Sequence, residues 1–483
     1  MRTMRKRPTT RSSGLQSPSA ISCQYLPEPL LLFSEDGLHI DPKSGIARFG
    51  PRSFGMARRH PTTVRVGMIG TADTVDKARA WLMDSANGVH GNTKHPEFPG
   101  YKGDRGYFSE LEFEDAWVEQ LTQTEVRNLT GIRYSRARFE ETVKLLDYKL
   151  RLLSEKDYPP NYIVLALPDE LIKRSRDTDY KDKDLGDVHR DLRRAIKAVA
   201  MRYRLPTQLL SQDVTEGRED DNPAKIAWNY FTGLYTKAGG IPWSPYGLTP
   251  ATCYVGISFF RPLGSKLPTL RTSLVQAFDE YGEGLVLRGH DFEWDPRKEG
   301  SPAPHLDEQH AHELIDKVLA RYQDEMKQMP QRVVVHKTSR YWPAERDGFM
   351  AALQGRVARY DLVALEQQSD VRLIPESKYP PLRGTSFRIG DLDFLYTTGY
   401  IGALEEYHGM GVPSPLRIAD HVGQDTPRDT LLREILTLTK LNWNSAHFAG
   451  SLPITLKFSR LVGDIMREIP PDREPLPQYK YYM

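Results

Sequence analysis

The sequence predicts an α/β protein of two domains, the first built on a parallel, Rossmann-like sheet and the second on a mixed sheet. In the first half, apolar β-branched runs alternate with amphipathic helices: strand 63–70 precedes helix 74–84, and helix 137–155 precedes strand 161–168. The Pro/Gly-rich stretch IPWSPYGLTPAT at 241–252 then marks a domain boundary. Beyond it strands come first and helices later, which indicates a mixed sheet.

Two runs in the second half are expected to be buried strands. TCYVGISFF (252–260) and QRVVVHKT (331–338) are apolar, rich in β-branched residues and bounded by turn or polar residues. The layout fits an RNase H-like domain. The expected division is a basic disordered tail with a lead-in segment at 1–58, a first domain at 59–245 and a second domain at 246–483. The other expected elements are strands at 271–277, 284–289 and within 361–396, and helices at 306–328, 342–355, 428–441 and 454–468.

Composition excludes several classes of protein. With 483 residues the chain is long enough for two or three domains, and no apolar run approaches the ~20 residues of a membrane span. Cys23 and Cys253 are too few for a disulfide framework or a Cys-based zinc site and suit a reducing cytosol, so we expect a cytoplasmic protein. Residues 1–20 are basic, contain no acidic residue and lack the apolar segment of a secretory signal, which indicates a disordered tail. The net charge of +2 leaves nucleic-acid binding to local patterns.

One such pattern lies in VHRDLRRAIKAVAMRY at 188–203, which we expect to form a helix. Its cations recur at i, i+3, i+4 and i+7, so they share one face opposite an apolar one, and Asp191 alone offsets them. A phosphate-binding surface is the functional interpretation, and a solvated basic face is the alternative. The cations are Arg190, Arg193, Arg194 and Lys197.

Sequence blocks on both sides of the boundary resemble the Argonaute family. The most specific are LNWNSAHF…LPITLKFS, within 436–466, and TKAGGIPW, within 235–243. The second-half blocks resemble a PIWI domain, and those before the boundary resemble a MID domain, which in that family binds the 5′ end of a guide strand. The resemblance implies a short prokaryotic Argonaute, with a Rossmann-like MID domain followed by an RNase H-like PIWI domain. The remaining blocks are YRLPTQLLSQDV (203–214), YVGISFFRP (254–262), VVVHKTSRYWPAE (333–345) and TTGYIGALEEYHGMGVPSPLRI (397–418).

The same resemblance assigns a guide-binding site. Charge-assisted donors suit a terminal phosphate, and the residues matching the family's pocket for the guide 5′ phosphate are His189, Arg193, Gln208 and Lys237, with His189 where many relatives have tyrosine. Contacts to the nucleic-acid backbone are assigned to Arg190, Arg194, Lys197 and Arg460. By the same resemblance, the terminal carboxylate of Met483 with Gln208 would hold a structural Mg²⁺ at the guide 5′ end; a frayed chain end is the alternative.

The resemblance places the metal-binding positions of active PIWI domains at Ser258, Thr338 and Arg460. Two-metal nucleases need several anionic oxygens there, and a hydroxyl without a carboxylate is a poor Mg²⁺ ligand. Arg460 places a fixed cation that repels Mg²⁺ and attracts phosphate. Glu280 or Glu283 is the candidate for a further glutamate of that site, but one carboxylate cannot assemble two metals. We therefore expect no catalysis by this chain.

Two other motifs are interpreted as structural and not as functional sites. His305, His310 and His312 with Asp307 suggest a metal site, but their spacing does not align on one helical face, and a helix start explains them better. Asp347, in an RDG sequence, lies in a predicted helix and is interpreted as coincidence.

The expected function is that of a sensor in a prokaryotic defence system. A guide RNA would direct recognition of plasmid or phage DNA, and by resemblance a separate APAZ-containing subunit would carry the effector: a sirtuin-like or TIR NADase, or a nuclease. Target binding would activate this effector and cause abortive infection. The alternatives are a guide-directed endonuclease that uses non-standard residues (Glu280, Glu283 or Asp347), and an unguided nucleic-acid-binding protein.

Overall fold

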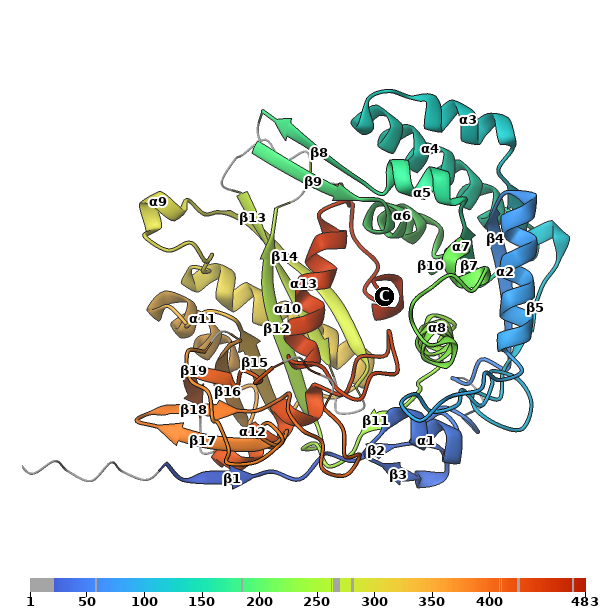
Figure 1. The fold of residues 1–483 in the computed structure, drawn as a ribbon. Helices are drawn as coiled ribbons and strands as arrows, with labels where there is room; N and C mark the ends of the chain where they lie inside the picture. The colour runs from blue at the N-terminus through green and yellow to red at the C-terminus, as the bar shows by residue number, and fades with distance from the viewer. Residues whose placement is uncertain are drawn as a thin grey trace, which may run out of the picture.

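The computed structural model describes residues 21–483 apart from 57–58, 184–185, 262, 264–269, 279–281, 368, 408, 410, 424–425 and 471–472. A parallel sheet from the first half of the chain and a larger mixed sheet from the second half form the two parts of the molecule, at the right and left of Figure 1. We call them the parallel-sheet domain and the mixed-sheet domain. The predicted α/β fold class is confirmed. In the described part of the chain, no helix combines the length and apolar character needed to cross a membrane.

The parallel-sheet domain alternates strands with helices. Its elements are β4 (Thr63–Gly70), α2 (Ala72–Ser85), β5 (Glu110–Glu112), β6 (Val118–Gln120), α3 (Gln123–Gly131), α4 (Ser135–Ser154), β7 (Tyr162–Ala166), α5 (Asp169–Ser175), α6 (Leu192–Ala200), β10 (Thr207–Leu209), α7 (Gln212–Thr215) and α8 (Pro223–Lys237). The strand order is β10-β7-β4-β5, with β6 also on β4, and every pair is parallel. All of β7 is buried, as expected for a strand covered on both faces. Thr71 caps α2, and Thr122 with Glu125 forms a capping box on α3.

The mixed-sheet domain contains a nine-stranded sheet in the order β1-β17-β18-β19-β16-β15-β12-β13-β14. Its elements after the boundary are β12 (Thr252–Phe260), β13 (Leu270–Phe278), β14 (Gly284–Glu293), α9 (Pro296–Glu299), α10 (Glu308–Met326), β15 (Arg332–Lys337), α11 (Pro343–Leu353), β16 (Arg359–Glu366), β17 (Thr385–Ile389), β18 (Leu392–Leu395), β19 (Leu416–Gly423), α12 (Arg428–Leu438) and α13 (Ile454–Met466). Strands β12, β15 and β16 pair in parallel, and β13 joins β12 antiparallel. This arrangement is the RNase H-like layout that was predicted.

Helices cover both faces of the mixed sheet. Along β12, Cys253 and Val255 face a core shared with α10 and α11, whereas Tyr254 faces the core that contains α12 and α13. The alternation follows from the two-residue period of a strand. Helix α13 lies between the mixed sheet and helices α6 and α8 (Figure 1). Its first turn sits directly on β12, because a Cβ added to Gly256 would lie 2.0 Å from the carbonyl oxygen of Thr455.

The segment before the parallel sheet joins both domains. Strand β1 (Cys23–Tyr25) forms the edge of the nine-stranded sheet by pairing with β17, and β2 (Leu31–Leu32) pairs with β3 (Leu38–His39) and with β11 (Ser244–Pro245). Between them Glu28 forms ion pairs with Arg383 and Lys440 of the mixed-sheet domain. The expected lead-in is therefore ordered from residue 21 to residue 56, and helix α1 (Pro42–Phe49) is part of it. The expected basic tail at 1–20 lies outside the described residues.

Most predicted elements are present, but the helix expected at 188–203 is wrong in its first part. Residues Gly186–Asp191 form β9, which pairs with β8 (Asp177–Asp182) in a hairpin, and α6 begins only at Leu192. Asp191 is the N-cap, and its side chain accepts a hydrogen bond from the backbone N–H of Arg194. Helix α8 and strand β19 were not predicted. Eleven of the 15 residues of α8 are buried, so it lacks an amphipathic period.

The contact at Gly256 generates a stability prediction. Gly256→Ala should push α13 off the sheet and lower the free energy of unfolding by about 1–3 kcal/mol, the usual range for overpacking. Gly131→Ala is the matched control, because a Cβ there meets nothing within 4 Å. Thermal unfolding should show a lower midpoint for the first variant only; equal midpoints would contradict the packing of α13 described above.

Candidate functional sites

Four polar side chains from three elements of the parallel-sheet domain gather where this domain meets α13. Helix α6 supplies Arg193 and Lys197, β10 supplies Gln208, and Lys237 is the last residue of α8. The ammonium Nζ of Lys237, which is 3% exposed, donates a hydrogen bond of 2.9 Å to Oε1 of Gln208. The same oxygen accepts a 2.8 Å bond from the hydroxyl of Tyr162. We call Arg193, Lys197, Gln208 and Lys237 the lysine cluster.

The lysine cluster is electrostatically unsatisfied. Burial lowers the pKa of Lys237 well below its usual value, and the neighbouring charge of Lys197 lowers this pKa further. Burial, and then the charge of Arg193, lower the pKa of Lys197 to about 8, against a partial opposing effect of Asp191. Within the described chain no carboxylate forms an ion pair with either lysine. An anion placed between them would favour both charged forms, so the cluster is suited to bind one.

The mixed-sheet domain holds this cluster in place. Its loop at 442–446, part of the LNWNSAHF block, lies against α8: the backbone N–H of Ala446 donates a 3.1 Å bond to Oδ1 of Asn229. Nearby, Nε1 of Trp243 donates to the carbonyl oxygen of Lys440 at 3.0 Å. A Cβ on Gly233 would be 3.5 Å from Oε1 of Gln208 and 3.7 Å from Asn444. The cluster therefore lies at the junction of the two domains.

The structure separates three predicted nucleic-acid contacts from this cluster. His189 is on β9, and its Nδ1 lies 2.8 Å from the Asp179 carboxylate across the hairpin. Arg190 forms ion pairs with Glu140 and, at 2.7 Å, with the buried Glu468 of the segment after α13. Arg194 pairs with Asp464 of α13 at 2.8 Å. Arg190 and Arg194 thus join the two domains, since Glu468 and Asp464 belong to the mixed-sheet domain. These carboxylates already neutralise the two arginines.

The end of the chain, which was predicted to take part in a magnesium site, is packed into the core. Tyr482 and Met483 are 0% and 1% exposed, within the same core as α8, so the alternative of a frayed end is not what the structure contains. Oε1 of Gln208 already accepts two hydrogen bonds, and two lysines beside it repel a divalent cation. The described donors around Gln208 therefore suit an anion better than Mg²⁺.

A second site is a cavity of about 320 Å³ lined by all three residues that the resemblance places at metal-binding positions. Ser258 lies on β12, Thr338 follows β15 and Arg460 lies on α13, so three separate elements bring them together. We call this the central cavity. The hydroxyl of Ser258 donates to the carbonyl oxygen of Ser459 at 2.9 Å, while Arg460 is exposed.

Charged groups around the central cavity are cationic or already paired. Lys337 also lines it, but its Nζ binds Glu345 at 2.5 Å. Asp464 is the one carboxylate among the described residues that line the cavity, and it forms an ion pair with Arg194. The described residues include no group of three or more His, Cys, Asp or Glu that could hold a metal ion.

The carboxylates proposed as alternatives lie elsewhere. Glu283 lines a different cavity and pairs with Arg59 at 2.5 Å, so its predicted role beside the metal positions is wrong for this structure. Asp347 lies on α11 at 3.2 Å from Arg346, away from the central cavity. Glu280 lies outside the described residues.

The histidine-rich segment is the start of a helix, as expected. Asp307 is the N-cap of α10, and its carboxylate accepts from the backbone N–H of His310 at 2.8 Å. His312 instead faces Asp316, 3.1 Å away. His305 is buried and stacks on Trp342 with ring centroids 4.3 Å apart. The three imidazoles do not converge.

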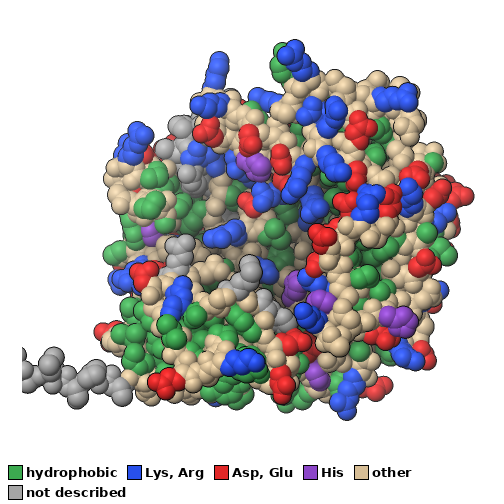
Figure 2. All heavy atoms as spheres, viewed as in Figure 1, with side chains coloured by type: hydrophobic (Ala, Val, Ile, Leu, Met, Phe, Trp, Pro, Cys, Tyr) green, Lys and Arg blue, Asp and Glu red, His purple; other side chains and the backbone are tan. Residues whose placement is uncertain are grey.

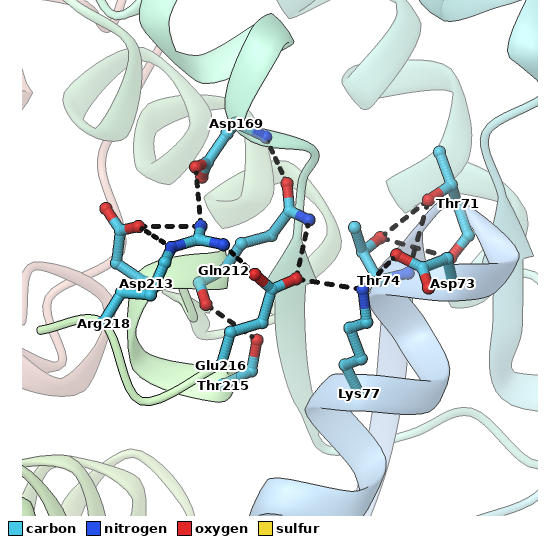
Figure 3. Close-up of polar contacts among 10 residues, drawn as sticks. All are labelled: Thr71, Asp73, Thr74, Lys77, Asp169, Gln212, Asp213, Thr215, Glu216 and Arg218. Atoms are coloured by element: carbon cyan, nitrogen blue, oxygen red, sulfur yellow. Dashed lines mark hydrogen bonds and ion pairs between the residues drawn. The ribbon is translucent and has the colours of Figure 1, made fainter.

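The carboxyl edge of the parallel sheet, where doubly wound folds commonly bind ligands, is closed by ion pairs. Figure 3 shows Glu216 between Lys77 of α2, at 2.9 Å, and Arg218. Arg218 also binds Asp169 at 3.1 Å and Asp213 at 2.8 Å. Sequence reasoning missed this cluster, which ties α2 to α7 and leaves no unpaired charge among the groups drawn.

Basic side chains surround the junction of the two domains. In Figure 2, Lys and Arg gather over the region where α6 and α13 lie, and the face is hollowed between the domains. A further cavity of about 840 Å³ lies between the N-terminal segment and both domains, and Lys43, Lys94 and Lys225 are among its lining residues. Sequence reasoning could not find this cavity, because its walls come from distant segments.

The chain matches no protein-family profile, and no curated protein resembles it in sequence. Its structure is similar to Clostridium butyricum Argonaute bound to a guide DNA (5′ deoxycytidine) and a 19-mer target DNA, with a TM-score of 0.65 and 16% identity over 94% of this chain and 54% of that one. It is also similar to Aa-Ago with externally bound siRNA, with a TM-score of 0.60 and 14% identity over 95% of this chain and 56% of that one. For Aquifex aeolicus Argonaute the TM-score is 0.58, with 16% identity over 93% of this chain and 54% of that one. The chain therefore has an Argonaute-like fold and spans about half the length of these proteins.

Lys197 generates a prediction on pH and stability. Its pKa falls from 10.5 to about 8 on folding, so between these values the unfolded chain binds more protons than the native one. Its destabilising contribution is therefore complete below pH 8 and decreases as the pH rises towards 10.5. Lys197→Met should raise the melting temperature more at pH 7 than at pH 10.

The matched control is Lys225→Met, because Lys225 is in the same domain but pairs with Asp221 at 2.7 Å. Differential scanning fluorimetry at both pH values measures the effect. The same change in melting temperature at pH 7 and pH 10 for Lys197→Met would contradict the lowered pKa of this lysine.

Proposed function

We propose that this chain is the guide-dependent sensor of a short prokaryotic Argonaute system, with a MID domain formed by the parallel sheet and a PIWI domain formed by the mixed sheet. The lysine cluster anchors the 5′ phosphate of a guide RNA, and the guide pairs with a DNA target. The observation that carries the proposal is the buried Lys237 and the half-buried Lys197 beside Gln208, two cations that form no ion pair with any carboxylate of the described residues. A terminal phosphate supplies the charge that these groups lack.

We assign Arg193 and Lys197 of α6 to the open side of the phosphate pocket, and the buried Lys237 to the floor of that pocket. Arg193 is exposed and has no carboxylate partner among the described residues, so it is available to a phosphate. His189 was matched to this pocket by resemblance, but its position on β9 beside Asp179 favours a contact with the hairpin. Two of the similar structures carry guide and target DNA or an siRNA, which supports nucleic acid as the ligand.

We further propose that the chain binds its target without cutting it. The central cavity has hydroxyls and an arginine at the positions assigned to metal ligands, and Arg194 neutralises its one lining carboxylate. Two Mg²⁺ ions need several anionic oxygens. Effector activity then resides in a separate APAZ-containing subunit, a sirtuin-like or TIR NADase or a nuclease. Target recognition would activate this effector in cytoplasmic defence against plasmids or phages and cause abortive infection.

The pocket assignment predicts a loss of end recognition. Replacing both Arg193 and Lys237 by alanine should weaken binding of a 5′-phosphorylated guide RNA by about 1–3 kcal/mol per lost charged contact. It should also abolish the preference for a phosphorylated over a hydroxyl 5′ end. Fluorescence anisotropy with both guides measures the two effects.

The control for this pair is Lys77→Ala, since Lys77 belongs to the separate ion-pair cluster of Figure 3. Binding by the control should stay phosphate-selective. If the double variant also remained phosphate-selective, the lysine cluster would not be the pocket for the guide 5′ end.

Because the positions assigned to metal ligands hold two hydroxyls and an arginine, we expect that restoring carboxylates at two of the three positions does not restore cleavage. Ser258→Asp combined with Thr338→Asp should not produce Mg²⁺-dependent cleavage of a guide-matched target, because Arg460 still repels the metals. A denaturing gel of labelled target measures cleavage. Guide-directed cleavage by the unmodified chain would contradict the proposal and support the endonuclease alternative.

A further inference from the structure

We propose that the central cavity binds one phosphodiester of the nucleic-acid backbone, with Arg460 as the cation and Arg194 as the residue that keeps Arg460 available. This inference rests on the proposed function and adds a specific anion site to it. The site is distinct from the lysine cluster, since it lies on the other side of α13, between this helix and strands β12 and β15.

The chemistry of the cavity suits a phosphodiester. The guanidinium of Arg460 forms no hydrogen bond or ion pair with any described residue, although it lines the cavity. The hydroxyls of Thr338 and Ser339 line the same space and likewise have no partner in the described chain. A planar guanidinium with hydroxyl donors beside it matches the oxygens of a phosphate. Lys337 adds no open charge, because Glu345 holds it at 2.5 Å.

The carboxylate of Asp464 is the group that could neutralise the guanidinium of Arg460. It lines the cavity and lies four residues after Arg460 on α13, the spacing at which a helix brings an acid and a base together. It instead binds Arg194 of α6 at 2.8 Å, with both side chains just over one third exposed, at 36% and 38%. Arg194 therefore occupies the carboxylate that would otherwise neutralise Arg460.

This arrangement gives Arg194 an indirect role. It is a positioning residue, since it acts on the phosphate site through Asp464 and is not among the lining residues of the cavity. Arg194 directly follows Arg193 of the lysine cluster on α6. The guide pocket and the central cavity consequently share one helix-to-helix contact, which Arg190 reinforces through Glu468.

The test uses the full chain loaded with a 5′-phosphorylated guide RNA and a series of DNA targets, each with one neutral methylphosphonate linkage. If Arg460 binds one phosphodiester, a neutral linkage at a single position, or at two adjacent ones, should weaken target binding roughly tenfold. Arg460→Gln should bind the unmodified target more weakly by a similar factor and show no further loss at that position. Arg340→Gln is the matched control, since Arg340 is exposed near Thr338 but does not line the cavity.

The role of Arg194 has its own variants. Arg194→Gln frees Asp464 to pair with Arg460, so it should remove the sensitivity to the same single linkage. Adding Asp464→Asn to this variant should restore that sensitivity, because the competing carboxylate is gone. A merely structural role for Arg194 would not give this rescue.

The outcomes separate the site from the function on which it rests. A penalty spread evenly over all linkages, or one that persists in Arg460→Gln, would overturn the site while guided binding stands. Equal affinity of the loaded chain for matched and scrambled targets would overturn the proposed function itself. Arg460-dependent binding of inorganic phosphate to the guide-free chain, without a linkage-specific effect, would identify a free-anion site and exclude the backbone assignment.

Discussion

Helix α13 determines how the two domains pack against each other. Its first turn rests on β12 at Gly256, where no side chain separates the helix from the strand. Along its length it meets α6, and Asp464 and the following Glu468 bind Arg194 and Arg190. The Arg190–Glu468 pair is largely buried, with side chains 12% and 3% exposed. Removing one partner of such a pair leaves an uncompensated buried charge, which is costly. The Arg190–Glu468 pair therefore fixes how the two domains pack against each other.

The basic residues at this junction fall into two groups, those that form ion pairs with carboxylates and those that do not. Arg190 and Arg194 form ion pairs with carboxylates across the junction, whereas Lys197 and Lys237 lie nearby without a counterion among the described residues. Removing these two lysines from water costs free energy on folding, and under the proposed function a bound phosphate would offset part of that cost. A ligand that is needed to satisfy a site also stabilises it, which suits a protein that must distinguish a loaded from an empty state.

The sequence was sufficient for the fold class and for most elements, because β4, β12 and β15 are apolar β-branched runs with clear ends. It also identified Ser258, Thr338 and Arg460, which converge in space although they lie far apart in the chain. It failed where tertiary contacts decide local structure. Residues 188–191 have helical spacing, but pairing with β8 and the N-cap at Asp191 place them in a strand.

The roles of individual cations could not be read from spacing alone. The four basic residues of 190–197 form one stripe in the sequence, yet two bind carboxylates of another domain and two belong to the lysine cluster. The partners that decide this difference, Asp464 and Glu468, lie more than 260 residues away. Helix α8 was missed for a related reason, since burial on nearly all sides removes the period that marks a surface helix.

The most direct test of a guided sensor is to purify the chain from cells and sequence the nucleic acid that comes with it. An anion site that selects a terminal phosphate predicts short RNAs of uniform length, with 5′ phosphates and a biased first base. Heterogeneous fragments without an end preference would contradict it, and would reduce the lysine cluster to a non-specific basic surface.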